Sequence, residues 1–141
     1  MNNNAGTVLY WDSSAVFSVL FQDDHSEKAG KWIKKPGVHL ISSLVNAEVY
    51  AVVSRLKKEN ILANLLYDAV IKAFEAGPWR QIYTHPDRTI LKSIASKYYL
   101  RGADLWHFCT VAQLQDQLPE IKLLTFDQRL NKAAASAGFS L

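Results

Sequence analysis

The chain has 141 residues, of which 49% are hydrophobic and 21% are charged. This composition fits one globular domain with a substantial core; it excludes a disordered chain, and no apolar run approaches the roughly 20 residues needed to cross a bilayer. The formal net charge of +3 permits binding to nucleic acid without requiring it.

Residues 1–6 lack the basic start and the long apolar stretch of a secretory signal. We expect a short disordered tail there, a single domain from residue 7 to residue 141, and a cytoplasmic location by default. The one cysteine, Cys109, rules out an internal disulfide and a cysteine-based zinc site. It lies in an apolar stretch and is interpreted as a small buried hydrophobic side chain.

Apolar periodicity and turn residues predict strands that alternate with helices along the whole chain. The alternation favours an α/β fold: a central, mainly parallel sheet sandwiched by helices. In such folds the functional cleft lies beyond the carboxyl ends of the strands. The predicted strands are 7–11, 38–41, 81–84, 121–125 and a short edge strand at 139–141; the predicted helices are 15–21, 27–34, 44–58, 61–75, 86–99, 103–115 and 128–137.

Two acidic residues stand directly where predicted strands end. Asp12 follows the first strand, and Asp127 follows the strand at 121–125. Each has an ordinary explanation as the N-cap of the next helix. In a parallel sheet, however, both carboxylates would also open onto one cleft.

Two further acids can reach the same cleft. Glu48 lies in the first half of the helix at 44–58 among apolar neighbours, where a carboxylate is costly unless it is paired, metal-bound or turned outward. Asp104 lies in the first turn of the helix at 103–115, where the helix dipole also favours an acid. Four converging carboxylates would repel one another. A hard divalent cation, Mg²⁺ or Mn²⁺, is the simplest compensation.

Four segments together resemble a known family. They are residues 8–15 (VLYWDSSA), 43–49 (SLVNAEV), 100–107 (LRGADLWH) and 124–130 (LTFDQRL). In this order and spacing they resemble the PIN-domain ribonucleases, most closely the VapC-type toxins of toxin–antitoxin pairs. Trp106 and Cys109 depart from the smaller aliphatic residues that are usual in that helix, without touching the acids.

The resemblance implies a PIN-like parallel sheet and cleavage of RNA by a divalent-metal-dependent endoribonuclease. Asp12, Glu48, Asp104 and Asp127 match the family's acidic, metal-binding positions, and Ser14 and Thr125 match positions where a hydroxyl supports the site. The resemblance also implies a homodimer and a cognate antitoxin protein that inhibits the enzyme.

We hypothesise that a metal-activated water hydrolyses the phosphodiester bond, with Glu48 orienting that water or binding a second ion. Arg101 either contacts a phosphate or serves as a surface ion-pair or helix-end residue. Basic clusters at residues 28–35 and 55–58 either hold the RNA backbone or are solvated helix faces.

His107 shares a helix face with Asp104. We interpret it as a packed histidine rather than a metal ligand or an acid–base group. His25, His39 and His85 carry no signal. The tryptophans are interpreted as core or interface residues rather than base-stacking platforms; they are Trp11, Trp32, Trp79 and Trp106.

Three other functions are alternatives for this pattern of residues. A haloacid-dehalogenase-like phosphatase needs a second Asp where Ser14 stands, and a receiver-type phosphoacceptor needs paired acids after the first strand and a late lysine that are not evident. A catalytically silent RNA- or protein-binding module on the same fold is the third. The four intact acids weigh against it, because binding alone does not need them.

Overall fold

The computed structural model describes residues 6–141, so the expected tail lies almost entirely outside the described residues and stays a prediction. Four strands form a parallel sheet in the order β3-β2-β1-β4. The strands are β1 (Thr7–Trp11), β2 (Gly37–Ser42), β3 (Trp79–Ile82) and β4 (Ile121–Leu124).

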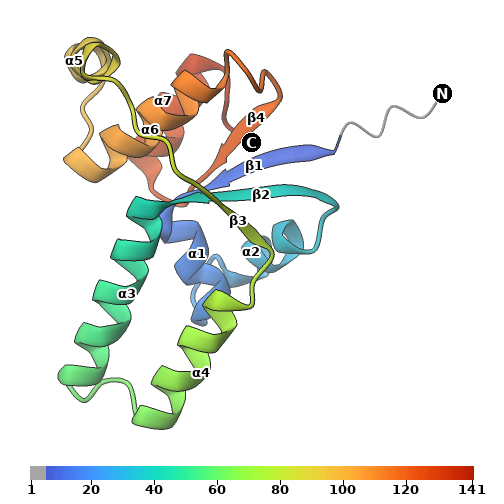
Figure 1. Ribbon diagram of the computed structural model, residues 1–141, viewed down its shortest axis with the longest axis vertical. Helices are drawn as coiled ribbons and strands as arrows, with labels where there is room; N and C mark the ends of the chain where they lie inside the picture. The colour runs from blue at the N-terminus through green and yellow to red at the C-terminus, as the bar shows by residue number, and fades with distance from the viewer. Residues whose placement is uncertain (1–5) are drawn as a thin grey trace.

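Helices cover both faces of this sheet (Figure 1). One layer holds α5 (Arg88–Lys97), α6 (Gly102–Leu114) and α7 (Gln128–Ala137). The other holds α1 (Ser13–Leu20), α2 (Ser26–Ile33), α3 (Ser43–Lys58) and α4 (Asn64–Glu75), of which α3 and α4 extend away from the sheet as a helical hairpin. Among the described residues, no helix is long and apolar enough to span a membrane.

The two faces of β1 build two separate cores. Val8 and Tyr10 point into the layer of α5, α6 and α7, whereas Leu9 and Trp11 point into the layer of α1 to α4. Such alternation follows from the period of two in a strand, and burial on both faces explains why β1 reads as a continuous apolar run. The predicted α/β sandwich is therefore confirmed.

The order of the strands reverses at β1. The chain moves from β1 to β2 to β3 on one side and then returns to place β4 on the other side of β1. Helices that follow β1 and β4 consequently lie on opposite faces, and a crevice opens between the carboxyl ends of these two strands. This topology fixes where a functional site is expected.

Two of the predicted strands differ from the structure by more than one residue at an end. The third strand lies at Trp79–Ile82, not at 81–84, because the Trp79 ring packs against Trp11 inside the core while Tyr83 is 85% exposed and leaves the sheet. The final strand is reduced to a single parallel bridge between Ser140 and Leu123. The helix predicted at 61–75 begins only at Asn64, and the one predicted at 86–99 spans Arg88–Lys97.

The start of β2 depends on a glycine. Gly37 has a φ of +145°, and a Cβ there would lie 2.2 Å from the carbonyl oxygen of Thr7 in β1. We predict that Gly37→Ala lowers the free energy of unfolding by more than about 2 kcal/mol, through this clash and the strained backbone. Urea unfolding measures the change.

Gly30 provides the matched control, since it lies within α2 and a Cβ there meets nothing within 4 Å. Gly30→Ala is expected to leave stability unchanged or to raise it by up to about 1 kcal/mol. Equal stability of the two variants would contradict this account of the β1–β2 contact.

Candidate active site

Asp12 occupies the crevice beside the end of β1 and is only 2% exposed. Its Oδ1 accepts hydrogen bonds from the Ser14 hydroxyl (2.7 Å) and from the backbone N–H of Ala15 (2.9 Å), and its Oδ2 accepts one from the Thr125 hydroxyl. Burial raises the pKa of the Asp12 carboxyl, and these hydrogen bonds partly offset that effect. One lone pair of Oδ2 remains without a partner among the described residues.

Two hydroxyl groups connect the ends of β1 and β4. The Ser14 hydroxyl accepts from the backbone N–H of Phe126 at 3.0 Å, and the Thr125 hydroxyl accepts from the N–H of Asp127 at 3.1 Å. Both hydroxyls donate to Asp12. The network therefore fixes the loop that carries Asp127 relative to Asp12.

Asp127 is the N-cap of α7, where its Oδ1 accepts from the N–H of Leu130 at 2.8 Å. Asp12 caps α1 in the same way through Ala15. The ordinary capping interpretation is thus confirmed for both acids. Capping occupies Oδ1 in each case, which leaves Asp127 Oδ2 free of hydrogen bonds from the described residues.

Asp104 lies in the first turn of α6 and accepts no hydrogen bond from any other described residue. Burial raises the pKa of its carboxyl, and the negative charges of Asp127 and Glu48 raise it further. The positive charge of Arg101 partly opposes this rise.

Asp104 and Asp127 line a hollow of about 350 Å³ that opens to solvent. The hollow lies between the start of α6 and the start of α7. Arg101 and Arg129 form part of its wall. The site thus combines exposed anionic oxygens with cationic side chains at the rim.

Glu48 approaches the site from α3 and is held from two sides. Its Oε2 accepts from the Ser13 hydroxyl at 3.1 Å, and its Oε1 accepts from Nε2 of His107 at 2.8 Å. The other ring nitrogen of His107 lies 2.6 Å from the hydroxyl of Tyr10, which donates to Ser42 at 2.9 Å. This buried chain joins α3, α6, β1 and β2 around one carboxylate.

The donor chemistry of the four acids fits a hard divalent cation. Within residues 6–141, no group of three or more His, Cys, Asp or Glu side chains stands close enough to hold a metal ion as placed. Binding would therefore require rotation of side chains such as Asp104, which carries no hydrogen bond to lose. All available donors are carboxylate oxygens, the ligands that Mg²⁺ and Mn²⁺ prefer.

Sequence reasoning anticipated these acids but missed what holds Glu48. His107 is packed as expected, being 1% exposed, yet it also bonds to Glu48 across the interior. Its position one helical turn after Asp104 was the available signal.

Arg101 stands at the N-cap of α6, not at a helix C-terminus, and forms no ion pair with another described residue. Cys109 is buried, and burial raises the pKa of its thiol to about 11.

A comparison with family models matches residues 9–136 to the PIN domain. The chain belongs to the PIN-domain family. The match covers β1 to α7 and all four acids, and it confirms the resemblance to PIN domains seen in the sequence. No curated protein sequence matches the chain at a significant level.

Solved structures agree on the fold of this PIN domain. VapC20 of Mycobacterium tuberculosis, a toxin that cleaves the sarcin–ricin loop, matches with a TM-score of 0.60 and 15% identity, over 93% of this chain and 95% of that one. PAE2754 from Pyrobaculum aerophilum matches with a TM-score of 0.61 and 17% identity, over 96% of this chain and 88% of that one. The PIN-like fold expected from the sequence is confirmed.

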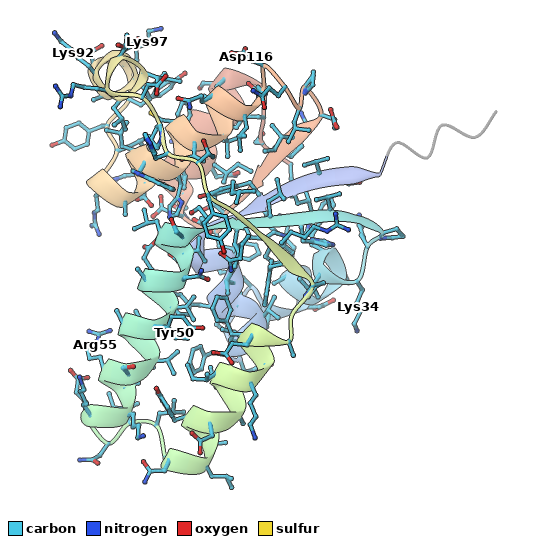
Figure 2. The ribbon with its side chains drawn as sticks, in the orientation of Figure 1. Lys34, Tyr50, Arg55, Lys92, Lys97 and Asp116 are labelled. Atoms are coloured by element: carbon cyan, nitrogen blue, oxygen red, sulfur yellow. The ribbon has the colours of Figure 1, made fainter. Side chains whose placement is uncertain are left out.

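The raised pKa of Asp104 implies that its charge destabilises the metal-free PIN domain. A folded-state pKa above the unfolded value means that stability is greater below the unfolded pKa and is lost as the pH rises through the folded pKa. Asp104→Asn is therefore expected to raise the melting temperature at pH 7 in EDTA, and the gain should shrink as the pH falls toward 4. Asp116→Asn, at an exposed acid (Figure 2), is the control and should give no gain.

The hydrogen-bond chain around Glu48 makes a second prediction. His107→Leu removes one of the two hydrogen-bond partners of Glu48 and leaves the buried hydroxyl of Tyr10 with Ser42 alone. We expect the free energy of unfolding to fall by about 2 kcal/mol in urea titrations. Tyr10→Phe should cost less, because the bond between His107 and Glu48 remains. Wild-type stability of His107→Leu would show that the chain contributes nothing.

Proposed function

We propose that this PIN domain is a divalent-metal-dependent endoribonuclease. The observation that carries the proposal is that Asp104 and Asp127 line one solvent-open hollow and that Asp127 is joined through Thr125 to the buried carboxylate of Asp12. A carboxyl such as that of Asp104, whose pKa is raised by burial and by neighbouring acids in a cleft, is typical of sites that perform chemistry. Membership of the PIN-domain family gives that chemistry its class, nucleic-acid hydrolysis.

Asp12, Asp104 and Asp127 are the residues that would hold Mg²⁺ or Mn²⁺, and Glu48 either binds a second ion or orients the attacking water. When bound, the ion lowers the pKa of water and stabilises charge on the phosphate. The three aspartates are held in different ways before an ion binds. Ser14 and Thr125 keep Asp12 in one orientation, Asp127 is fixed by its cap bond to Leu130, and Asp104 is free to adjust.

Glu48 is suited to act on a water molecule because its orientation is fixed. With one oxygen held by Ser13 and the other by His107, the carboxylate keeps lone pairs available in a defined direction. Arg101, which lines the hollow with Asp104, is placed to contact a phosphate of the substrate. Its guanidinium would offset the negative charge that RNA brings to a cluster of acids.

We further propose that the chain is the toxin of a toxin–antitoxin pair, acting in the cytoplasm as a homodimer and inhibited by a cognate antitoxin protein. The support is the resemblance of the four sequence segments to VapC-type toxins, together with the shared fold of VapC20. Size-exclusion chromatography of the purified protein tests the dimer, and mass spectrometry of proteins that co-purify with the tagged chain from its native cells tests the partner.

The nuclease proposal is tested by incubating purified, partner-free protein with total RNA in Mn²⁺, in Mg²⁺ and in EDTA. We expect cleavage that requires the metal and that falls by about a hundredfold or more in Asp104→Asn. Asp116→Asn controls for the loss of a carboxylate away from the site and should cleave like the wild type.

Two outcomes would contradict the proposal. A folded protein that neither cleaves RNA nor binds Mn²⁺ would remove the basis of the four-acid site. RNA binding without cleavage, unchanged in Asp12→Asn, would instead favour a silent binding module on the same fold.

A further inference from the structure

A second hollow lies next to the acid-lined one on the surface of the α5–α7 layer. It has a volume of about 350 Å³ and is formed by the segment that joins α5 to α6 and by one side of α7. Leu100 and Arg129 line both hollows. The two hollows are therefore adjacent, and we call the second one the α7 groove.

The α7 groove is cationic. Lys97, Arg129 and Lys132 line it, all three are exposed, and no acidic side chain is among its lining residues. The acid-lined hollow contains Asp104 and Asp127, whereas every charged residue that lines the α7 groove is a cation. A polyanion that presents one phosphate to the acids would meet compensating positive charge in the adjacent α7 groove.

The basic clusters at residues 28–35 and 55–58 lie away from both hollows, and several of their side chains contact neighbouring residues. Lys34 lies beside the start of β2, and Arg55 lies toward the far end of α3 (Figure 2). Several neighbouring lysines are also engaged locally. Lys31 pairs with Glu27, Lys35 lies 3.7 Å from the centre of the Trp32 ring, and Lys57 lies 4.2 Å from that of Tyr67.

The α7 groove also contains an exposed aromatic ring. Tyr99 is 90% exposed and lies 5.9 Å from the guanidinium carbon of Arg129, whereas the adjacent Tyr98 is turned inward, with its ring 5.0 Å from that of Phe108. Tyr99 contributes little to the core in this position. An accessible ring among cations is the arrangement on which bases of single-stranded nucleic acid stack.

Resting on the proposed nuclease function, we propose that the α7 groove binds the single-stranded RNA that flanks the cleaved bond on one side. One unpaired base stacks on Tyr99, and the phosphates beside it contact Arg129 and Lys132. A paired base inside a duplex has no free face to offer this ring. The groove therefore selects single-stranded segments, such as loops, for delivery to the acids.

The test compares Tyr99→Ala with Tyr99→Trp in two assays. Binding of a short fluorescein-labelled single-stranded RNA is followed by anisotropy in EDTA, and KM and kcat for its cleavage are measured in Mn²⁺. Tyr99→Ala should weaken binding and raise KM by about tenfold or more, with little change in kcat. Tyr99→Trp should restore both to within about twofold.

Tyr83→Ala is the matched control, since Tyr83 is 85% exposed but lines neither hollow. It should bind and cleave like the wild type. Lys132→Ala should reduce the dependence of the logarithm of affinity on the logarithm of salt concentration by about 0.7. Lys72→Ala, on α4, should leave that slope unchanged.

The outcomes separate this proposal from the one on which it rests. Wild-type binding and KM in Tyr99→Ala, from a protein that cleaves RNA, would overturn the α7 groove and leave the nuclease in place. An equal loss in Tyr83→Ala would also overturn it. A folded wild type that neither binds nor cleaves RNA would overturn both proposals.

Discussion

The buried carboxylate of Asp12 sets the conditions for the rest of the site. Burying an unpaired carboxylate costs free energy of folding. Here the hydroxyls of Ser14 and Thr125 and the N–H of Ala15 offset that cost by donating hydrogen bonds to Asp12. Because Thr125 belongs to the loop after β4, the same bonds connect the two strands on either side of the crevice. The interaction that makes burial tolerable therefore also positions Asp127.

At Asp104, Asp127 and Glu48, the arrangement proposed for catalysis lowers the stability of the metal-free fold. Burial, together with the charges of Asp127 and Glu48, raises the pKa of Asp104, which means that the ionised carboxylate destabilises the folded metal-free domain. Glu48 is held through His107 and Tyr10 to the centre of the sheet, so the core restrains an acid that would otherwise turn outward. A site of this kind favours a bound cation, because the cation relieves the repulsion.

Much of this arrangement was predictable from the sequence. Strand and helix alternation gave the α/β sandwich, and acids directly after strands gave the location of the crevice. The boundaries of β3 were not predictable, because they depend on the packing of Trp79 against Trp11. Nor was the bond between His107 and Glu48, which joins residues 59 positions apart. Lys97 is far in the sequence from Arg129 and Lys132, and it joins them in the α7 groove only through folding.

The most direct test of this account is a crystal structure of the wild-type protein soaked in Mn²⁺, with anomalous scattering used to locate the ion. We predict a peak in the hollow between α6 and α7, about 2.1 Å from carboxylate oxygens of Asp104, Asp127 and Asp12. Asp104 should have rotated toward it. A structure that places Mn²⁺ elsewhere, or leaves this hollow without an ion while the same protein cleaves RNA, would contradict the central claim.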